Sequence, residues 1–167
     1  MTVIVVMGVS GSGKTTVGTA LATALGVDYA EADEFHPRSN IEKMTTGTPL
    51  TDDDRLPWLH AIAAWIGAHA ERGGVVTCSA LKRRYRDTLR TGGPAWFLHL
   101  WGGRELIARR MTTRSGHFMP VSLLDSQLAD LEPLGADEPG CTVDVAAPAG
   151  EIVAGLLRDR PWPRPGA

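Results

Sequence analysis

Residues 8–15 read Gly8-Val9-Ser10-Gly11-Ser12-Gly13-Lys14-Thr15, which satisfies the pattern G-x-x-x-x-G-K-S/T. The stretch follows an uninterrupted apolar run at 3–7 and precedes residues 15–25, whose apolar spacing is helical. Such a loop holds phosphate because its backbone N–H groups converge and the following helix adds the positive end of its dipole. The sequence therefore predicts an ATP-phosphate cradle that extends to Thr16, with Lys14 on the outer phosphates and the Thr15 hydroxyl on Mg²⁺.

Outward from this loop, strand and helix patterns alternate along the chain. Further strands are predicted at residues 27–32, 75–78, 95–100 and 142–145, and helices at 39–46, 52–66, 82–90, 104–113, 122–131 and 151–157. This alternation predicts a three-layer α/β fold, in which a five-stranded parallel sheet is flanked by helices joined by right-handed crossovers. A ligand site is then expected at the carboxyl ends of the strands.

The helix predicted to start near residue 52 has clear N-terminal signals but contains a proline in its second turn. Thr51 can cap it, and the three aspartates that follow suit the positive end of the helix dipole. Pro57 removes a backbone donor, so we expect a single turn, a kink and then the main helix. The apolar residues after the kink have helical spacing and are expected in the core rather than on a sugar: Trp58, Ile62, Trp65 and Ile66.

The overall composition is that of an ordinary globular domain. The 167 residues are 43% hydrophobic and 22% charged, with a formal net charge of −2, so nothing favours nucleic acid or an acidic membrane surface as a partner. The start of the chain lacks a basic leader, and we expect a cytoplasmic protein. A single domain is predicted over 1–160, followed by a flexible tail at 161–167. Cys78 and Cys141 lie in apolar stretches and are expected to be buried free thiols.

A phosphate cradle serves kinases and hydrolytic switches alike, so the acceptor side has to distinguish them. No predicted strand ends in a separate metal-binding acid, and the nearest carboxylate is Asp33, just after the second strand. Asp33 could accept a proton from a substrate hydroxyl or hold Mg²⁺ through water. The alternative is a solvated loop aspartate.

Further motifs follow the glycine loop in order along nearly the whole chain. They are Asp33 with His36-Pro37, Asn40-Ile41-Glu42-Lys43-Met44, Asp52-Asp53-Asp54-Arg55 with Pro57-Trp58-Leu59, Cys78-Ser79-Ala80-Leu81-Lys82, Tyr85-Arg86-Asp87, Gly116-His117-Phe118 and Gly135-Ala136-Asp137-Glu138. Together they resemble the small, thermoresistant-type gluconokinases. The resemblance implies transfer of the ATP γ-phosphoryl group to the 6-hydroxyl of D-gluconate, a P-loop kinase fold like that of shikimate kinase or nucleoside monophosphate kinases, and a homodimer. Related kinases often carry Asp-x-Asp where this chain has Glu31-Ala32-Asp33, which leaves a metal role for Glu31 open.

Gluconate is an anionic polyol, so its site needs a cation and several hydrogen-bonding groups. Arg55 and Lys82 are the candidates for its carboxylate or hydroxyls, and His36 is a candidate for a hydroxyl. Arg55 could instead pair with Asp52, and His36 could cap or pack. Tyr85, with Arg86 beside it, and His117 lie on matched motifs and complete the predicted acceptor residues, whereas Arg83 and Arg84 are expected to face solvent.

A helical lid is predicted at about residues 109–121. Arg110 and Arg114 share one helical face and are expected to stabilise charge on the γ-phosphoryl oxygens while water is excluded. An exposed basic helix end is the alternative. By analogy with related folds, adenine is expected near the loop after Val145.

Two competing functions remain open on the sequence. A shikimate-kinase-like enzyme for another small metabolite is the nearer alternative, although Ser79-Ala80-Leu81 stands where shikimate kinases are expected to have a triple-glycine turn. The second alternative is a nucleotide switch or binding module that hydrolyses ATP slowly. The ordered acceptor motifs favour the gluconate kinase over both.

Overall fold

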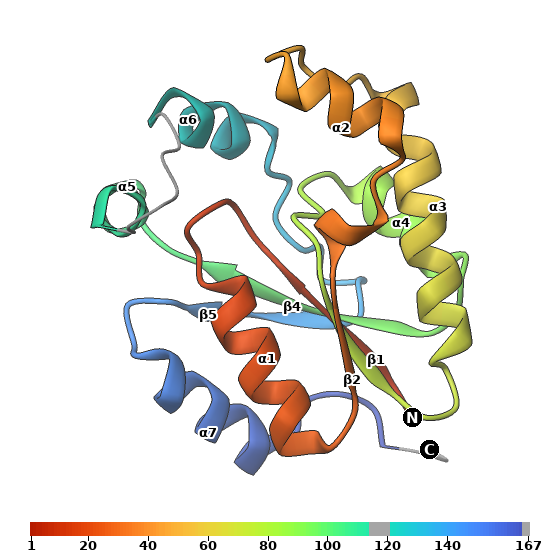
Figure 1. Ribbon diagram of the computed structural model, residues 1–167. Coiled ribbons are helices and arrows are strands. Elements are labelled where there is room, and N and C mark those ends of the chain that lie inside the picture. Colours follow the sequence, from red (N-terminus) through yellow and green to blue (C-terminus); the bar gives the residue numbers. More distant parts are fainter. Residues whose placement is uncertain (114–120, 165–167) are drawn as a thin grey trace.

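The computed structural model describes residues 1–113 and 121–164 of the chain (Figure 1). Its strands form one parallel sheet in the order β2-β3-β1-β4-β5, which confirms the predicted five-stranded α/β fold. The strands are β1 (Val3–Met7), β2 (Asp28–Glu31), β3 (Gly74–Thr77), β4 (Ala95–Trp101) and β5 (Gly140–Asp144). The helices are α1 (Lys14–Leu25), the 3-10 helix η1 (Ala32–Phe35), α2 (Arg38–Thr45), α3 (Asp52–Ala68), α4 (Arg83–Arg90), α5 (Arg104–Thr113), α6 (Val121–Asp130) and α7 (Ala149–Asp159).

Both faces of the central strand β1 are buried, as its apolar run predicts. Val3, Val5 and Met7 pack toward α3 and α4, whereas Ile4 and Val6 pack toward α1 and α7. Figure 1 shows α1 and α7 side by side on one face, with α3 and α4 on the other. α2 and α6 stand beyond the sheet, near the loop that joins β1 to α1, and so flank the place where a ligand site is expected.

α3 is one continuous helix through Pro57, so the prediction of a separate first turn before the main helix was wrong. Thr51 and Asp54 form a reciprocal capping box that anchors the start of the helix. Pro57 lies in the second turn and removes one backbone hydrogen bond. The side chains that follow it toward the core, among them Trp58 and Ile62, are buried, and their packing offsets that loss.

η1 and α2 form an arm whose base carries Asp33, and η1 did not emerge from the sequence. α2 is tied to α3, because Lys43 Nζ donates to both carboxylate oxygens of Asp54 at 2.8 and 2.9 Å and the Asn40 amide donates to the Asp54 carbonyl at 2.8 Å. The hydrogen bond from Lys43 is the largest cause that lowers the pKa of Asp54 to about 2. The predicted start of α3 therefore also fixes the arm above the sheet.

The end of the chain contacts the body up to the last described residues. Trp162 packs edge-on against Trp96 with ring centroids 5.9 Å apart, and the Thr2 hydroxyl donates to the Pro163 carbonyl at 3.1 Å. The expected flexible tail therefore remains a prediction for 165–167, outside the described residues. None of the helices described has the length and apolarity required to cross a membrane.

Candidate active site

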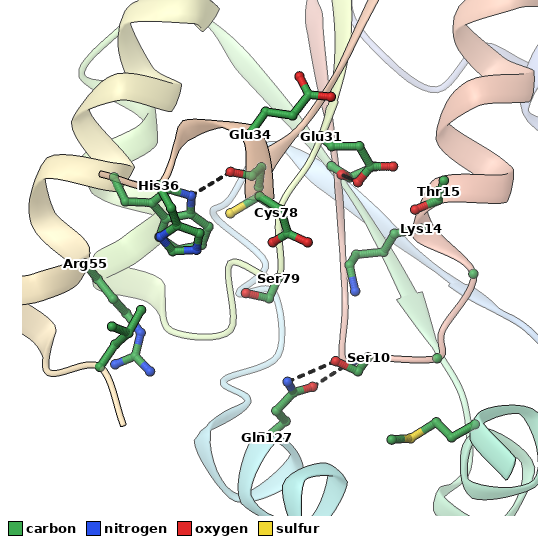
Figure 2. Close-up of a pocket in the computed structure, with 18 residues that line it drawn as sticks. Ser10, Lys14, Thr15, Glu31, Glu34, His36, Arg55, Cys78, Ser79 and Gln127 are labelled. Carbon is green, nitrogen blue, oxygen red and sulfur yellow. Dashed lines mark hydrogen bonds between the residues drawn. The ribbon is translucent and has the colours of Figure 1, made fainter. Parts of the chain in front are cut away.

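A cavity of about 700 Å³ opens at the carboxyl ends of β1, β2 and β3. It joins the glycine loop to the arm formed by η1, α2 and the start of α3 (Figure 2). Its walls carry residues of the donor motif and of the acceptor motifs together: Ser10, Gly11, Gly13, Lys14, Thr15, Glu31, Asp33, Glu34, His36, Arg55, Trp58, Thr77, Cys78, Ser79, Met111 and Gln127. The position matches the rule that parallel sheets bind ligands beyond their carboxyl ends.

The glycine loop has the backbone that a phosphate cradle requires. Gly13 caps α1 with φ 93°, a left-handed conformation that favours glycine. At Gly8 a Cβ atom would lie 2.7 Å from the Leu100 carbonyl oxygen, so only glycine allows β1 to turn there against β4. Lys14 Nζ donates to the carbonyls of Gly8 and Val9 at 2.9 and 3.0 Å, which holds the ammonium inside the curve of the loop.

Glu31, at the end of β2, is an ionised carboxylate beside the start of α1. It accepts hydrogen bonds from the Thr77 hydroxyl at 2.6 Å and from the Tyr29 hydroxyl. Burial raises the pKa of Glu31, but hydrogen bonds from Thr77, Tyr29 and Thr15 and the charge of Lys14 outweigh it and hold the pKa below its usual range. The longer side chain that departs from the Asp-x-Asp pattern therefore reaches the predicted Mg²⁺ ligand Thr15.

Asp33 and His36 lie on the arm side of the cavity. Burial lowers the pKa of His36, and Arg55 adds to this effect, whereas Asp33 opposes it. The imidazole stacks on Trp58, with ring centroids 4.5 Å apart and an interplanar angle of 8°. Asn40 Nδ2 lies 3.4 Å from His36 Nδ1, which suits a neutral ring that accepts there and donates from Nε2.

Trp58 has a second role that the sequence did not suggest. It is buried in the core as predicted, yet its edge also lines the cavity, and its indole N–H donates to the Ala32 carbonyl at 2.7 Å. The ring thus supports both η1, which carries Asp33, and the face of His36. The sequence feature that could have indicated this second role is the place of Trp58 in the motif Pro57-Trp58-Leu59.

The basic candidates of the acceptor motifs divide into two groups. Arg55 lines the cavity and lies 3.7 Å from Asp52, so the pairing that the sequence left open is present without removing Arg55 from the site. Tyr85 donates its hydroxyl to Asp52, and its ring lies under Lys82 Nζ at 5.8 Å and near Arg84. Among the described residues, Lys82 and Tyr85 are outside the cavity wall, next to its rim residue Arg55.

Arg86 is a buried structural cation and not a substrate contact. Its guanidinium donates to both carboxylate oxygens of Glu138 at 2.7 and 2.9 Å, and this pair is almost completely buried. It also donates to the carbonyl of Ala80 at 2.9 Å, where the backbone turns with φ 45°. Placing Arg86 among the acceptor candidates was therefore wrong: it joins the motif after β3 to the motif before β5 and holds the loop that carries Ser79.

Arg86→Met is expected to lower the free energy of unfolding by about 3 kcal/mol, because it leaves the Glu138 carboxylate buried without its cation. The matched control is Arg83→Met on the same helix. Arg83 forms a partly exposed pair with Asp137, so its loss is expected to be much smaller. Urea unfolding followed by circular dichroism measures both, and equal losses would contradict the structural role of Arg86.

The arginines of the predicted lid are described only in part. Arg110 donates to the Val145 carbonyl at 2.6 Å, beside the loop where adenine is expected, and is not one of the described residues that line the cavity. Arg114 and His117 lie outside the described residues. Cys78 faces the cavity as a free thiol whose pKa burial raises to about 12, and Cys141 is a half-buried free thiol.

Gln127 of α6 is a cavity residue that the sequence did not reveal. Its side-chain oxygen accepts the backbone N–H of Ser10 at 2.7 Å, and its side-chain nitrogen donates to the Ser10 hydroxyl at 3.1 Å (Figure 2). The two residues are separated by 117 positions in the chain, so no local spacing pointed to the contact.

Comparison with known proteins finds similar chains in sequence and in structure. A family model described as shikimate kinase matches residues 10–126. The gluconokinase of Gluconobacter oxydans (strain 621H) is 55% identical over 158 residues, which cover 93% of this chain and 89% of that protein. A solved gluconokinase from Sinorhizobium meliloti 1021 is 51% identical, with a TM-score of 0.84 and coverage of 94% of this chain and 92% of that one.

The shikimate kinase of Aquifex aeolicus has a TM-score of 0.62 at 16% identity, with 94% of each chain covered, and therefore shares the fold alone. By contrast, the gluconokinases of Gluconobacter oxydans and Sinorhizobium meliloti share high identity with this protein over nearly the full length of both chains. The chain belongs to the gluconokinase family of P-loop kinases.

Proposed function

We propose that this protein transfers the γ-phosphoryl group of ATP to the 6-hydroxyl of D-gluconate, giving 6-phospho-D-gluconate and ADP. The observation that carries the proposal is a shared cavity of about 700 Å³. Its wall includes the glycine loop together with Asp33, His36 and Arg55. This volume suits a small polyol beside the phosphates of a nucleotide. The curated and solved relatives named gluconokinase support the choice of acceptor.

In the proposed reaction, the loop N–H groups and Lys14 hold the outer phosphates of ATP and stabilise the charge that spreads over the γ-phosphoryl oxygens. Arg55 pairs with the gluconate carboxylate, and His36 donates from Nε2 to a hydroxyl. Asp33 accepts the proton of the 6-hydroxyl as that oxygen attacks phosphorus. The predicted roles of Arg110 and Arg114 in stabilising charge on the γ-phosphoryl oxygens, and of His117 in binding gluconate, remain part of the proposal.

The residues near Thr15 fit Mg²⁺. The described residues contain no group of three or more His, Cys, Asp and Glu side chains that could hold an ion by themselves. Mg²⁺ usually takes few protein oxygens and completes its shell with phosphate oxygens and water. The Thr15 hydroxyl, with the Glu31 and Asp33 carboxylates nearby, would serve such an ion, which neutralises charge on the β- and γ-phosphates when bound.

A coupled assay of ADP release with Mg-ATP is expected to show turnover that depends on gluconate. Shikimate, neutral sugars and nucleoside monophosphates serve as the alternative acceptors, and their kcat/KM is expected to be at least about 100-fold lower, because each leaves the buried polar groups of the site unpaired. Phosphorus NMR identifies the ester position of the product. Turnover with shikimate but not gluconate would contradict the proposed acceptor, and ADP release without any acceptor would favour a nucleotide switch.

The proposal also includes a cytoplasmic homodimer, which the resemblance to small gluconokinases implies. Light scattering coupled to size-exclusion chromatography is expected to give twice the chain mass of 17.9 kDa. A mass of one chain at micromolar concentration would contradict the dimer and leave the catalytic proposal unaffected.

A further inference from the structure

Helix α6 is fastened to the glycine loop by the Gln127 carboxamide. The amide makes two hydrogen bonds to Ser10, one from the backbone N–H at 2.7 Å and one to the hydroxyl at 3.1 Å. A primary amide offers a donor and an acceptor side by side, and Ser10 presents the complementary pair. The contact is therefore specific in geometry, and both residues line the cavity.

α6 and the residues just after it also contact α5 and the segment between β3 and α4. Arg104 of α5 donates to both carboxylate oxygens of Asp125 at 2.6 and 3.0 Å. Beyond the carboxyl end of α6, the Glu132 N–H donates to the Leu81 carbonyl at 2.7 Å, and its carboxylate accepts the Arg83 N–H at 2.8 Å. These contacts tie α6 to the segment that follows Ser79, on the acceptor side of the cavity.

α6 thus connects the two halves of the cavity. On one side it contacts Ser10 of the glycine loop, and on the other the segment after β3. That segment also contacts the glycine loop directly, because the Ser79 carbonyl accepts the Gly8 N–H at 3.3 Å. Gly11, directly after Ser10, has φ 80°, which favours glycine, and it lies against Met111 and Ile107 of α5. Among the described residues, Gln127 supplies the side-chain hydrogen bonds that join this outer turn, residues 10–11, to another helix.

We propose that Gln127 is a positioning residue for phosphoryl transfer, which fixes the outer turn of the glycine loop relative to the acceptor side of the cavity. It acts through Ser10 and does not itself touch the reacting atoms. This inference rests on the proposed kinase function. Small misplacements of groups that hold a reacting phosphate are costly, because they remove alignment that the folded protein otherwise supplies.

The test uses Gln127→Met, which keeps the length of the side chain and removes both hydrogen bonds. We expect kcat with gluconate and ATP to fall about tenfold, which matches the loss of two neutral hydrogen bonds. The affinity for ADP is expected to stay within about twofold of wild type. Ser10→Ala, which removes one of the bonds, is expected to lower kcat about threefold. The double variant is expected to equal Gln127→Met, because both changes remove the same coupling. Ser126→Ala, on an exposed part of α6, is the matched control.

A second measurement does not depend on turnover. Amide hydrogen exchange of the peptide containing Ser10 is expected to accelerate in Gln127→Met, while exchange in β1 and β4 stays unchanged. Unchanged exchange together with a kcat close to that of wild type would overturn the inference, as would multiplicative effects in the double variant. If wild-type protein does not phosphorylate gluconate at all, the proposed function fails, and the exchange experiment still decides whether Gln127 holds the loop.

Discussion

Lys14→Ala is expected to lower kcat/KM for ATP by about 10²- to 10³-fold, the usual cost of removing one preorganised donor from a developing anion. In the structure, the Lys14 ammonium lies inside the loop on the carbonyls of Gly8 and Val9. It is therefore already desolvated in part and positioned where the outer phosphates arrive. Because it meets phosphate in both the ground state and the transition state, ATP affinity is expected to fall together with kcat.

Steady-state kinetics and isothermal titration with a non-hydrolysable ATP analogue measure the two effects separately. Arg72→Ala removes one cation from an exposed turn after α3 and controls for the change in net charge. Thermal unfolding checks that the loop variant remains folded. A Lys14→Ala protein that retains most of the wild-type kcat/KM would contradict the assignment.

The sequence predicted the sheet and the donor loop well because their signals are local. The apolar run of β1, the glycines and the start of α1 occupy one continuous stretch, so periodicity and turn chemistry were sufficient. The parallel sheet followed from the alternation of strands and helices. η1 was missed because four residues in one 3-10 turn leave no periodic pattern, and Pro57 was misread because packing compensates one lost hydrogen bond.

Long-range pairs were the part of the site that the sequence could not resolve. Arg83 and Arg86 stand close together in one basic run, yet one faces an exposed aspartate and the other is buried against Glu138. The helical spacing of Arg86 with the buried Leu89 was the only local indication that it faces the core. No local feature of the sequence indicated that Gln127 lines the cavity, because a single amide on an amphipathic helix ordinarily faces solvent.

Asp33→Asn is expected to lower kcat by about 10²- to 10⁴-fold, the range that positioned proton transfer contributes. The change preserves the size of the side chain but replaces the carboxylate with an amide, which is too weakly basic to take up the 6-hydroxyl proton. Asp33 stands on η1, which Trp58 supports through its bond to the Ala32 carbonyl, so the variant is expected to keep the geometry of the arm. ATP affinity is expected to stay near wild type, since the loop and Lys14 are untouched.

This contrast between kcat and ATP affinity separates a base from a metal ligand. If Asp33 chiefly held Mg²⁺, Asp33→Asn would raise the Mg²⁺ concentration needed for half-maximal rate, and excess Mg²⁺ would restore much of the activity. If Asp33 is the base, excess Mg²⁺ leaves kcat low, whereas Glu31→Gln, beside Thr15, is the variant that responds to Mg²⁺. Asp53→Asn, an exposed aspartate in the first turn of α3, makes the same chemical change outside the cavity and is expected to leave kcat unchanged. Near wild-type turnover in Asp33→Asn would exclude the proposed base, and the acceptor hydroxyl would then lose its proton to the phosphoryl oxygens or to solvent.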